Sequence, residues 1–525
     1  MRKGVALYAS VLFLLAHSWM FADISVPNER SRVYLSVAIV DHGTLSIDTS
    51  VARFGRILDW ARFEGRAYTD KAPGSSLLGV LPYAVARVFT SPEDWTIAQL
   101  VRLMRTWVML PIALLGFFVM RRVLHDLGAD DHVATLGAGA WCLGTSAFHY
   151  GQAFYGHQIV GVMLVTALWF VLRVEHGHST RPALECALAG LCAGVAGLTE
   201  YQAGVPCVLL AAYLLSGSAR CARHVAAFSL GTAPCLAMLL AYNTIAFGGP
   251  FELSYHYLVV PHLAELHREG VGGVATPRAA LIRPVLFSLH RGWLVTSPVF
   301  VLVPLGLGLM WRSGRRRLCA LVGATALFYF LLVISTRAWF GGWSFGPRLL
   351  VPGMGWSMIA ATFPLVYWNS SVGWSVLTRG LIACGFVYHQ LVHVVLPELP
   401  PSVTNPLLDV TLPALRQGVF APNVVSWLTG TSSLWTLSPM AIVAAAWLLF
   451  VLWTPTSLGE PRDEEPHADA RAISLESAPV HAAAAASCLS AFFAVVLVVG
   501  PGLPAQKSAQ LLRTIATWQA NEHER

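Results

Sequence analysis

Long apolar segments separated by short polar connections run through most of the chain. A helix needs about 20 mostly apolar residues to cross the hydrocarbon core of a bilayer, and thirteen segments approach that length. They are residues 4–22, 98–120, 132–149, 155–173, 183–199, 202–217, 222–246, 293–311, 318–336, 349–367, 373–396, 437–454 and 483–502. The pattern predicts an all-α polytopic membrane protein with about 11 to 13 transmembrane helices.

Residues 73–90 are also apolar, but they do not read as a plain spanning helix. Pro73, Gly74, Gly79 and Pro82 interrupt the segment, and proline inside a helix removes a backbone hydrogen bond. We therefore expect an interfacial or re-entrant helix here. If the segment were counted as a membrane span, every later arginine-rich connection would lie on the outer face instead of the inner face.

Arginine is dense in the short connections on one side of this topology. With the N-terminus inside, these connections are residues 121–122, 173–181, 220–224 and 312–317. Short cytoplasmic loops of membrane proteins carry such an excess of positive charge. The long polar loops then face outside together, at residues 23–97, 247–292 and 397–436. We expect the chemistry of the protein on this outer face.

Composition supports a membrane protein and excludes other classes. The chain is 55% hydrophobic and 12% charged, whereas a soluble domain carries about 25% charged residues. The net charge of +7 comes from arginines scattered over many loops, so no nucleic-acid partner is expected. The nine cysteines form no Cys-x-x-Cys pair and indicate neither a disulfide framework nor a zinc site.

The stretch from Arg337 to Arg348 combines two arginines with bulky aromatics and three glycines between two apolar segments. Rings such as Trp343 suit the headgroup zone, and an arginine beside a membrane needs an anion, water or a partner. The stretch predicts a polar pocket at the membrane surface for an anionic lipid head or a sugar. The alternative is an aromatic loop with a stop-transfer arginine.

The first outer loop begins with Asn28 and Glu29, followed by an amphipathic pattern that suits a helix lying on the membrane. Asn28 is a good helix cap, and the helix dipole stabilises a carboxylate in the first turn. Glu29 is therefore a candidate general base that takes a proton from an acceptor hydroxyl. The alternative is that Glu29 serves only the helix end.

Tyr68, Asp70 and Lys71 stand directly before the break at Pro73. Lys71 is a point cation suited to a phosphate, and Asp70 is placed to orient it. The alternative is an exposed loop with surface salt bridges, which would explain the same residues and would contribute little to stability.

Three further residues are weaker candidates for substrate contacts. Glu200 and its neighbour Tyr201 interrupt an apolar region, where a carboxylate is costly unless it is functional or paired with an arginine. His157 lies in an aromatic stretch that suits sugar stacking, although a tight turn explains it equally well. His389 and His393 have metal-ligand spacing but no third ligand, so no metal is expected.

Several motifs occur in an order that resembles a known class. After the acidic motif come Tyr68-Thr-Asp-Lys-Ala-Pro-Gly74, Gly197-Leu-Thr-Glu-Tyr201, Arg291-Gly-Trp-Leu-Val-Thr-Ser-Pro298 and Gly341-Gly-Trp-Ser-Phe-Gly-Pro-Arg348. Over about residues 1–370 the chain resembles the bacterial GT-C-class membrane glycosyltransferases, the set similar to protein O-mannosyltransferases and the lipid A aminoarabinose transferase.

The resemblance implies an enzyme that takes a sugar from a polyprenyl-phosphate carrier on the outer leaflet. It places the catalytic base on Glu29 and the donor site at Lys71. The chain departs from the class in two places. Asn28-Glu29 stands where many members have an acidic pair, and Lys71-Ala72-Pro73 replaces Lys-Pro-Pro. The first departure leaves a single carboxylate and puts metal assistance in doubt.

A phosphate leaving group needs cations near its developing charge. Four basic residues are expected at the headgroup plane for this purpose: Lys71, Arg291, Arg337 and Arg348. No glycine-rich nucleotide loop is present, which agrees with a lipid donor, and no cofactor is expected.

The sequence thus predicts a glycosyltransferase of a bacterial inner membrane, with its site facing the periplasm or exterior. It would move a hexosyl or pentosyl group from a polyprenyl-phosphate donor to a hydroxyl of a lipid, glycan or protein. The alternatives are a transporter or flippase of lipid-linked glycans and a catalytically inactive relative. We expect the catalytic module in residues 1–370. Residues 371–525 would add further helices, the outer loop 397–436 and an inner linker at 455–482.

Overall fold

The structure is a computed structural model. It describes Val11, residues 26–217, 222–368, 372–431, 433–453 and 477–499, and five positions after residue 499. Apart from Val11, the expected span 4–22 lies outside the described residues, as do residues 455–476 of the expected linker.

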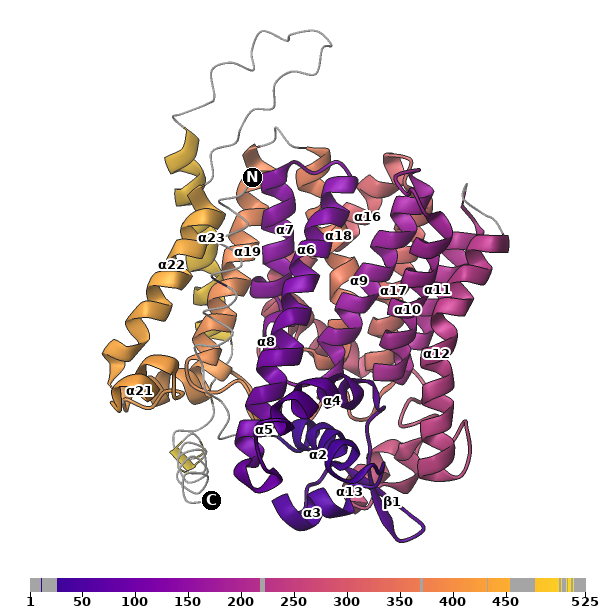
Figure 1. Ribbon diagram of the computed structural model, residues 1–525. Coiled ribbons are helices and arrows are strands. Elements are labelled where there is room, and N and C mark those ends of the chain that lie inside the picture. Colours follow the sequence, from indigo (N-terminus) through magenta and orange to yellow (C-terminus); the bar gives the residue numbers. More distant parts are fainter. Residues whose placement is uncertain are drawn as a thin grey trace.

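The described residues form a bundle of long helices, shown side by side in Figure 1. Within them, seven helical stretches are long and apolar enough to cross a membrane: Ile97–Asp126, Gly156–Glu175, Pro182–Thr199, Ala222–Phe247, Arg316–Ser335, Arg348–Tyr367 and Leu434–Leu452. Shorter apolar helices cover Tyr201–Leu215, Pro298–Arg312 and Ala486–Val498. The predicted all-α multi-pass bundle is confirmed.

Each expected span has a helical counterpart where the structure describes it. The bundle helices are α5 (Ile97–Met104) continuing through η3 (Arg105–Met109) into α6 (Leu110–Asp126), α7 (Asp131–Gly144), α8 (Ala147–Gln152), α9 (Gly156–Glu175), α10 (Pro182–Thr199), α11 (Gly204–Leu215), α12 (Ala222–Phe247), α16 (Val303–Arg312), α17 (Arg316–Ser335), α18 (Val351–Tyr367), α19 (Val372–His393), α22 (Ser438–Trp453) and α23 (Ser477–Val499). Helix α23 begins inside the stretch that the sequence assigned to the inner linker.

Helix α18 is the centre of the bundle, and its apolar window is 89% buried. It packs against α7, α9, α16 and α17. Trp356 of α18 and Trp141 of α7 are among the largest fully buried side chains. In contrast, α12 buries only 17% of its window, which fits a helix facing lipid.

Helices α10 and α12 approach so closely that glycine is required at their contact. A Cβ added at Gly190 would overlap the carbonyl oxygen of Phe228, and one at Gly231 would overlap that of Ala187. Small residues allow backbones of membrane helices to pack directly on each other. The α10–α12 contact therefore depends on glycines that let the two backbones touch, rather than on large side chains that interdigitate.

The two long loops before residue 300 lie at the same end of the bundle, at the bottom of Figure 1. The first contains α2 (Pro27–His42), α3 (Asp48–Phe54), the antiparallel hairpin of β1 (Trp60–Phe63) and β2 (Arg66–Thr69), α4 (Gly74–Arg87) and η2 (Pro92–Asp94). The second contains η5 (Ser254–Tyr257), α13 (Pro261–His267), η6 (Ala279–Leu281), α14 (Ile282–Phe287) and α15 (Trp293–Thr296), with η7 (Pro298–Leu302) leading into α16.

Later connections add short helices. The stretch 337–348 ends in η8 (Arg348–Leu350), and the segment after α19 holds η9 (Leu407–Thr411), α20 (Leu412–Arg416), α21 (Val424–Thr429) and η10 (Leu434–Leu437). The positive φ angles of Gly341, Gly342 and Gly346, at 70°, 73° and 74°, let the 337–348 segment turn tightly.

Helix α4 corresponds to the segment expected to be interfacial or re-entrant. It packs on α2, α5 and α10 and leaves Leu81 71% exposed, and Phe89 just after it is 82% exposed. Apolar side chains exposed at the end of a membrane bundle are expected to enter the lipid surface.

Helix α2 differs from the expectation of a helix lying on the membrane. Its residues from Asn28 to Ala38 are almost all buried, because α3, α4, α5 and β2 pack around it. It begins at Pro27 with Val26 at the N-cap position, so Asn28 does not cap the helix as the sequence indicated.

We expect Gly231→Val to loosen the α10–α12 contact, because the added atoms meet backbone that cannot move aside. Overpacking of this kind costs about 1–3 kcal/mol. The measurement is the thermal unfolding midpoint of the purified protein in detergent. Gly197→Ala in α10 is the matched control, because a Cβ there meets nothing within 4 Å. Equal midpoints for Gly231→Val and the wild type would contradict this account.

Candidate active site

A cavity of about 1770 Å³ opens at the end of the bundle that carries α2, α3 and α13 (Figure 1). Its wall comes from the start of α2, the residues that flank the hairpin of β1 and β2, the start of α9, the residues that follow α10, the loop of η5 and α13, and the segment around 337–348. Segments distant in sequence therefore meet in one space. Its charged lining residues are Arg30, Arg32, Arg53, Arg56, Asp59, Asp70, Lys71, Glu93, Glu200 and Arg348.

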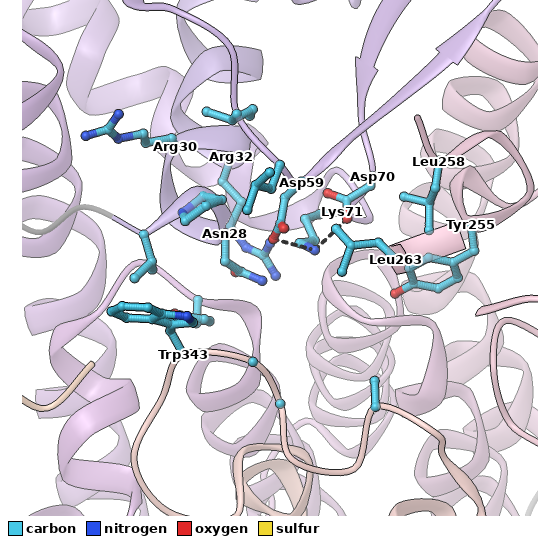
Figure 2. Close-up of a pocket in the computed structure, with 18 of the residues that line it drawn as sticks. Asn28, Arg30, Arg32, Asp59, Asp70, Lys71, Tyr255, Leu258, Leu263 and Trp343 are labelled. Carbon is cyan, nitrogen blue, oxygen red and sulfur yellow. Dashed lines mark hydrogen bonds and ion pairs between the residues drawn. The ribbon is translucent and has the colours of Figure 1, made fainter. Parts of the chain in front are cut away.

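Lys71 lies between two carboxylates. Its Nζ is 2.7 Å from Oδ2 of Asp70 and 3.0 Å from Oδ2 of Asp59. The hairpin explains the arrangement, because Trp60 pairs with Thr69 and the residues just beyond this pair are Asp59 and Asp70. Figure 2 shows the ammonium of Lys71 facing Asp59 inside the cavity.

This trio holds opposed charges in a largely enclosed place. Burial acts to raise the pKa of the Asp59 carboxyl, but Lys71, Arg348 and Arg32 hold that pKa below its usual value. Burial raises the pKa of Asp70, with Lys71 opposing the rise and Asp59 adding to it. Burial acts to lower the pKa of Lys71, yet the two carboxylates outweigh it and keep the lysine charged.

A second charged cluster joins α2 to the facing ends of α9 and α10. Nη2 of Arg32 donates to Oε1 of Glu200 at 2.8 Å, and Nδ1 of His157 lies 3.3 Å from the same oxygen. Nε and Nη1 of Arg32 are buried and have no hydrogen-bond partner within the described part of the chain. The arginine thus keeps unused donors at the cavity wall.

Arg348 supplies another cation, and it keeps a hydrogen-bond donor without a partner among the described residues. Its Nη1 donates to the carbonyl of Gly341 at 2.7 Å, and its guanidinium lies 5.5 Å from the centre of the Tyr155 ring. No carboxylate of the described residues lies within ion-pair distance of it, and its Nε is buried without a partner among them. An anion entering the cavity would find these donors unoccupied.

One side of the cavity is apolar and belongs to a membrane helix. Phe328 and Leu332 of α17 line it together with Leu349, and Leu263 and Leu266 of the outer loop also line the cavity. The cavity therefore joins a charged floor to an apolar wall, as an amphiphilic ligand requires.

Aromatic rings gather next to the charged floor. Tyr255 stacks on His267 with ring centres 4.8 Å apart and a 16° interplanar angle, and Tyr201 meets Tyr255 edge to face at 6.1 Å. All three residues line the cavity, as does Trp343. Such rings provide flat apolar faces beside hydrogen-bonding groups, which suits a sugar.

No family model matches the chain, and no curated protein matches its sequence. Solved structures do match. The crystal structure of ArnT from Cupriavidus metallidurans bound to undecaprenyl phosphate covers 94% of this chain and 76% of its own, with a TM-score of 0.51 and 15% identity. The oligosaccharyltransferase of Archaeoglobus fulgidus matches 85% of this chain and 55% of its own, with a TM-score of 0.45 and 12% identity. EmbB from Mycobacterium smegmatis matches 94% of this chain and 40% of its own, with a TM-score of 0.39 and 15% identity.

The chain has a GT-C-like fold. The likeness to ArnT establishes the fold alone at this identity, and it confirms the resemblance indicated by the order of the sequence motifs.

Seven of the residues singled out in the sequence line the cavity of this GT-C-like chain. They are Asp70, Lys71, His157, Glu200, Tyr201, Trp343 and Arg348. Four others do not line it: Glu29, Tyr68, Arg291 and Arg337.

Glu29 is fully buried behind the cavity. Nε and Nη2 of Arg105 donate to its two carboxylate oxygens at 2.9 and 2.6 Å, and the backbone N–H of Phe154 donates to Oε1 at 2.7 Å. Asn28 and Arg32 are four residues apart, so they share the α2 face that lines the cavity, whereas Glu29 points elsewhere. The sequence-based role of Glu29 as base stays a prediction, without a contact to the cavity.

The other three residues have structural neighbours of their own. Arg291 donates to the carbonyls of Phe340 and Gly342 and so supports the 337–348 segment from behind. Arg337 is partly exposed and pairs with Glu265 and Glu269, each at 3.3 Å. Tyr68 packs edge to face on Phe247.

Six charged lining residues were missed in the sequence: Arg30, Arg32, Arg53, Arg56, Asp59 and Glu93. A signal for Asp59 was present, because Glu64-Gly65 forms the centre of a two-residue hairpin loop, with φ of 47° and 81°. Counting outward from that centre pairs Asp59 with Asp70. Arg32 could be found from its spacing of four residues after Asn28.

Among the described residues, no three His, Cys, Asp or Glu side chains are placed to hold a metal ion. Between the two carboxylates of the hairpin stands the ammonium of Lys71. The expectation that no metal takes part stays a prediction.

We expect Glu29→Gln to destabilise the fold, because it leaves the Arg105 guanidinium without its carboxylate. Breaking a buried pair in this way costs about 3 kcal/mol or more. The measurement is the thermal unfolding midpoint, with the exposed Glu64→Gln as a control. An unchanged midpoint together with lost turnover would instead favour the role of Glu29 as base.

Proposed function

We propose that this protein is a membrane glycosyltransferase. It transfers a sugar from a polyprenyl-phosphate-linked donor to a hydroxyl of a lipid, glycan or protein. The reaction takes place on the outer face of a bacterial inner membrane, where the long loops enclose the cavity. The sugar is a hexosyl or pentosyl group, and no cofactor takes part.

The observation that carries this proposal is the joining of a charged floor to an apolar wall in one cavity. Lys71, Arg32 and Arg348 line the floor, and Phe328 and Leu332 of α17 line the wall. A polyprenyl phosphate has the same division, since its phosphate stays at the headgroup plane while its isoprenoid chain stays in the hydrocarbon. A water-soluble sugar nucleotide would make no use of the apolar wall.

The phosphate is bound by Arg348 and Lys71. An ammonium has three N–H donors. Two of those on Lys71 meet Asp59 and Asp70, so one remains for a phosphate oxygen. Arginine binds phosphate oxygens in a planar, bidentate manner, and Nε of Arg348 has no partner within the described residues. Both cations would stabilise the negative charge that develops as the sugar leaves.

Two further observations support the choice of donor and sugar. The crystal structure of ArnT, which shares the fold, contains undecaprenyl phosphate. In this chain, the rings of Tyr201, Tyr255 and Trp343 line the same cavity as Asp70 and Lys71. They provide a surface for the sugar in the cavity that also holds the cations proposed to bind its phosphate.

We expect Arg348→Ala to weaken binding of undecaprenyl phosphate by about 10- to 100-fold, because a hydrogen bond to a charged group contributes about 1.5–3 kcal/mol. Binding is measured by titrating the lipid into the purified protein in detergent. Arg416→Ala is the matched control, because Arg416 is exposed on α20 and lies outside the cavity lining. Unchanged affinity in Arg348→Ala would remove this residue from the donor site.

A further inference from the structure

Four carboxylates line the cavity. Glu93 is exposed, whereas Asp59, Asp70 and Glu200 are largely buried and differ in how far they are already engaged. Glu200 is paired with Arg32 at 2.8 Å and has His157 and Gln202 beside it. Its side chain is 10% exposed. A carboxylate held by a buried arginine is committed to that pair, since releasing it would leave the arginine without a counter-charge.

Asp70 is held from two sides. It accepts from Lys71 at 2.7 Å and from the hydroxyl of Ser31 at 3.4 Å, and its side chain is only 5% exposed. Its backbone carbonyl also accepts from the hydroxyl of Ser254. These contacts fix Asp70 as the support of Lys71 and leave little room for an incoming hydroxyl.

Asp59 is the most accessible of the three. Its side chain is 19% exposed, and its contact with Lys71 uses one carboxylate oxygen, Oδ2. Asn28 lies on the same side of the cavity (Figure 2). The Asn28 side-chain oxygen is buried and has no partner in the described part of the chain. A neutral amide can orient a hydroxyl but cannot take its proton.

We propose that Asp59 is the catalytic base of the glycosyl transfer. This inference rests on the proposed function and names the residue that activates the acceptor. The acceptor hydroxyl donates to Oδ1 of Asp59. As its oxygen forms the bond to the anomeric carbon, its proton passes to the carboxylate. The bond from that carbon to the phosphate oxygen breaks, and its electron pair stays on the polyprenyl phosphate.

Lys71 links the two halves of this reaction. Two acceptors on one ammonium, each about 3 Å from the nitrogen, lie about 5 Å apart. A phosphate oxygen on the third N–H of Lys71 would therefore be about 5 Å from Asp59, which leaves space for the acceptor oxygen and the anomeric carbon. Lys71 is in this way a positioning residue for the base as well as a donor to the phosphate.

Donor binding would also strengthen the base. Lys71, Arg348 and Arg32 hold the pKa of Asp59 below its usual value against the effect of burial. A bound phosphate neutralises part of that positive charge, and a nearby negative charge raises the pKa of a carboxyl. Asp59 would thus become a better proton acceptor when the donor is present.

The test uses the full chain in its host. Mass analysis of envelope glycans and lipids identifies the species that a deletion strain loses and the wild-type gene restores. We expect Asp59→Asn to reduce restoration of this species by about 100-fold or more, and Asp59→Glu to recover part of it. Glu64→Gln, at the exposed turn of the same hairpin, should restore it fully.

Binding separates a base from a residue that holds the donor. We expect purified Asp59→Asn to bind undecaprenyl phosphate within about threefold of the wild type and to keep its thermal midpoint, because Asp70 remains as the counter-charge of Lys71. Restoration of the species at the wild-type level by Asp59→Asn would overturn the proposal. A variant that loses product together with lipid binding or stability would also overturn it.

Failure of the proposed function would look different. If wild-type protein binds no undecaprenyl phosphate and the deletion strain lacks no sugar-bearing species, the glycosyltransferase assignment itself fails. If the wild type meets both conditions and Asp59→Asn remains fully active, only the base assignment fails.

Discussion

The ion trio of Asp59, Lys71 and Asp70 is the interaction on which the site depends. A lysine in an enclosed place keeps its charge only where carboxylates compensate it, and here two of them do so at 3.0 and 2.7 Å. The pairing of β1 with β2 brings the two carboxylates together, because Asp59 and Asp70 directly flank the last strand pair, Trp60 and Thr69. The hairpin and the helix that follows Lys71 thus place one cation where an anionic ligand can reach it.

Helix α2 distributes charge to two different places. Its face with Asn28 and Arg32 lines the cavity, whereas Glu29 turns to Arg105 and fastens α2 to the long helical stretch of α5, η3 and α6. Arg32 in turn reaches Glu200 at the end of α10. Both pairs are largely buried, and they tie α2 to the bundle beside the cavity.

A polar pocket can lie next to lipid in this fold because the membrane helices and the loops at one end of the bundle satisfy different polar groups. The helices satisfy their own backbone groups in the membrane, and glycines such as Gly190 and Gly231 let α10 and α12 pack backbone to backbone. The loops at one end then enclose polar groups away from the hydrocarbon. In the GT-C-like fold of this chain, the apolar side of α17 continues into that enclosure, so an amphiphilic ligand can remain in both environments at once.

The sequence by itself determined the membrane bundle, the positions of its helices and the end at which polar residues gather, because burial in lipid imposes long apolar runs and charge placement sets the topology. It also indicated Lys71, Arg348 and five other lining residues, since a charged side chain near a membrane is costly unless it is paired or functional. Only the tertiary structure decided which side chains share the cavity. A rotation of about 100° along α2 points Glu29 away from the face that carries Asn28. Strand pairing brings Asp59 next to Asp70. The guanidinium of Arg291 donates to carbonyl oxygens of a segment distant in the sequence. Such contacts join residues far apart in the chain, and local patterns of polarity carry no information about the partner that each charge finds.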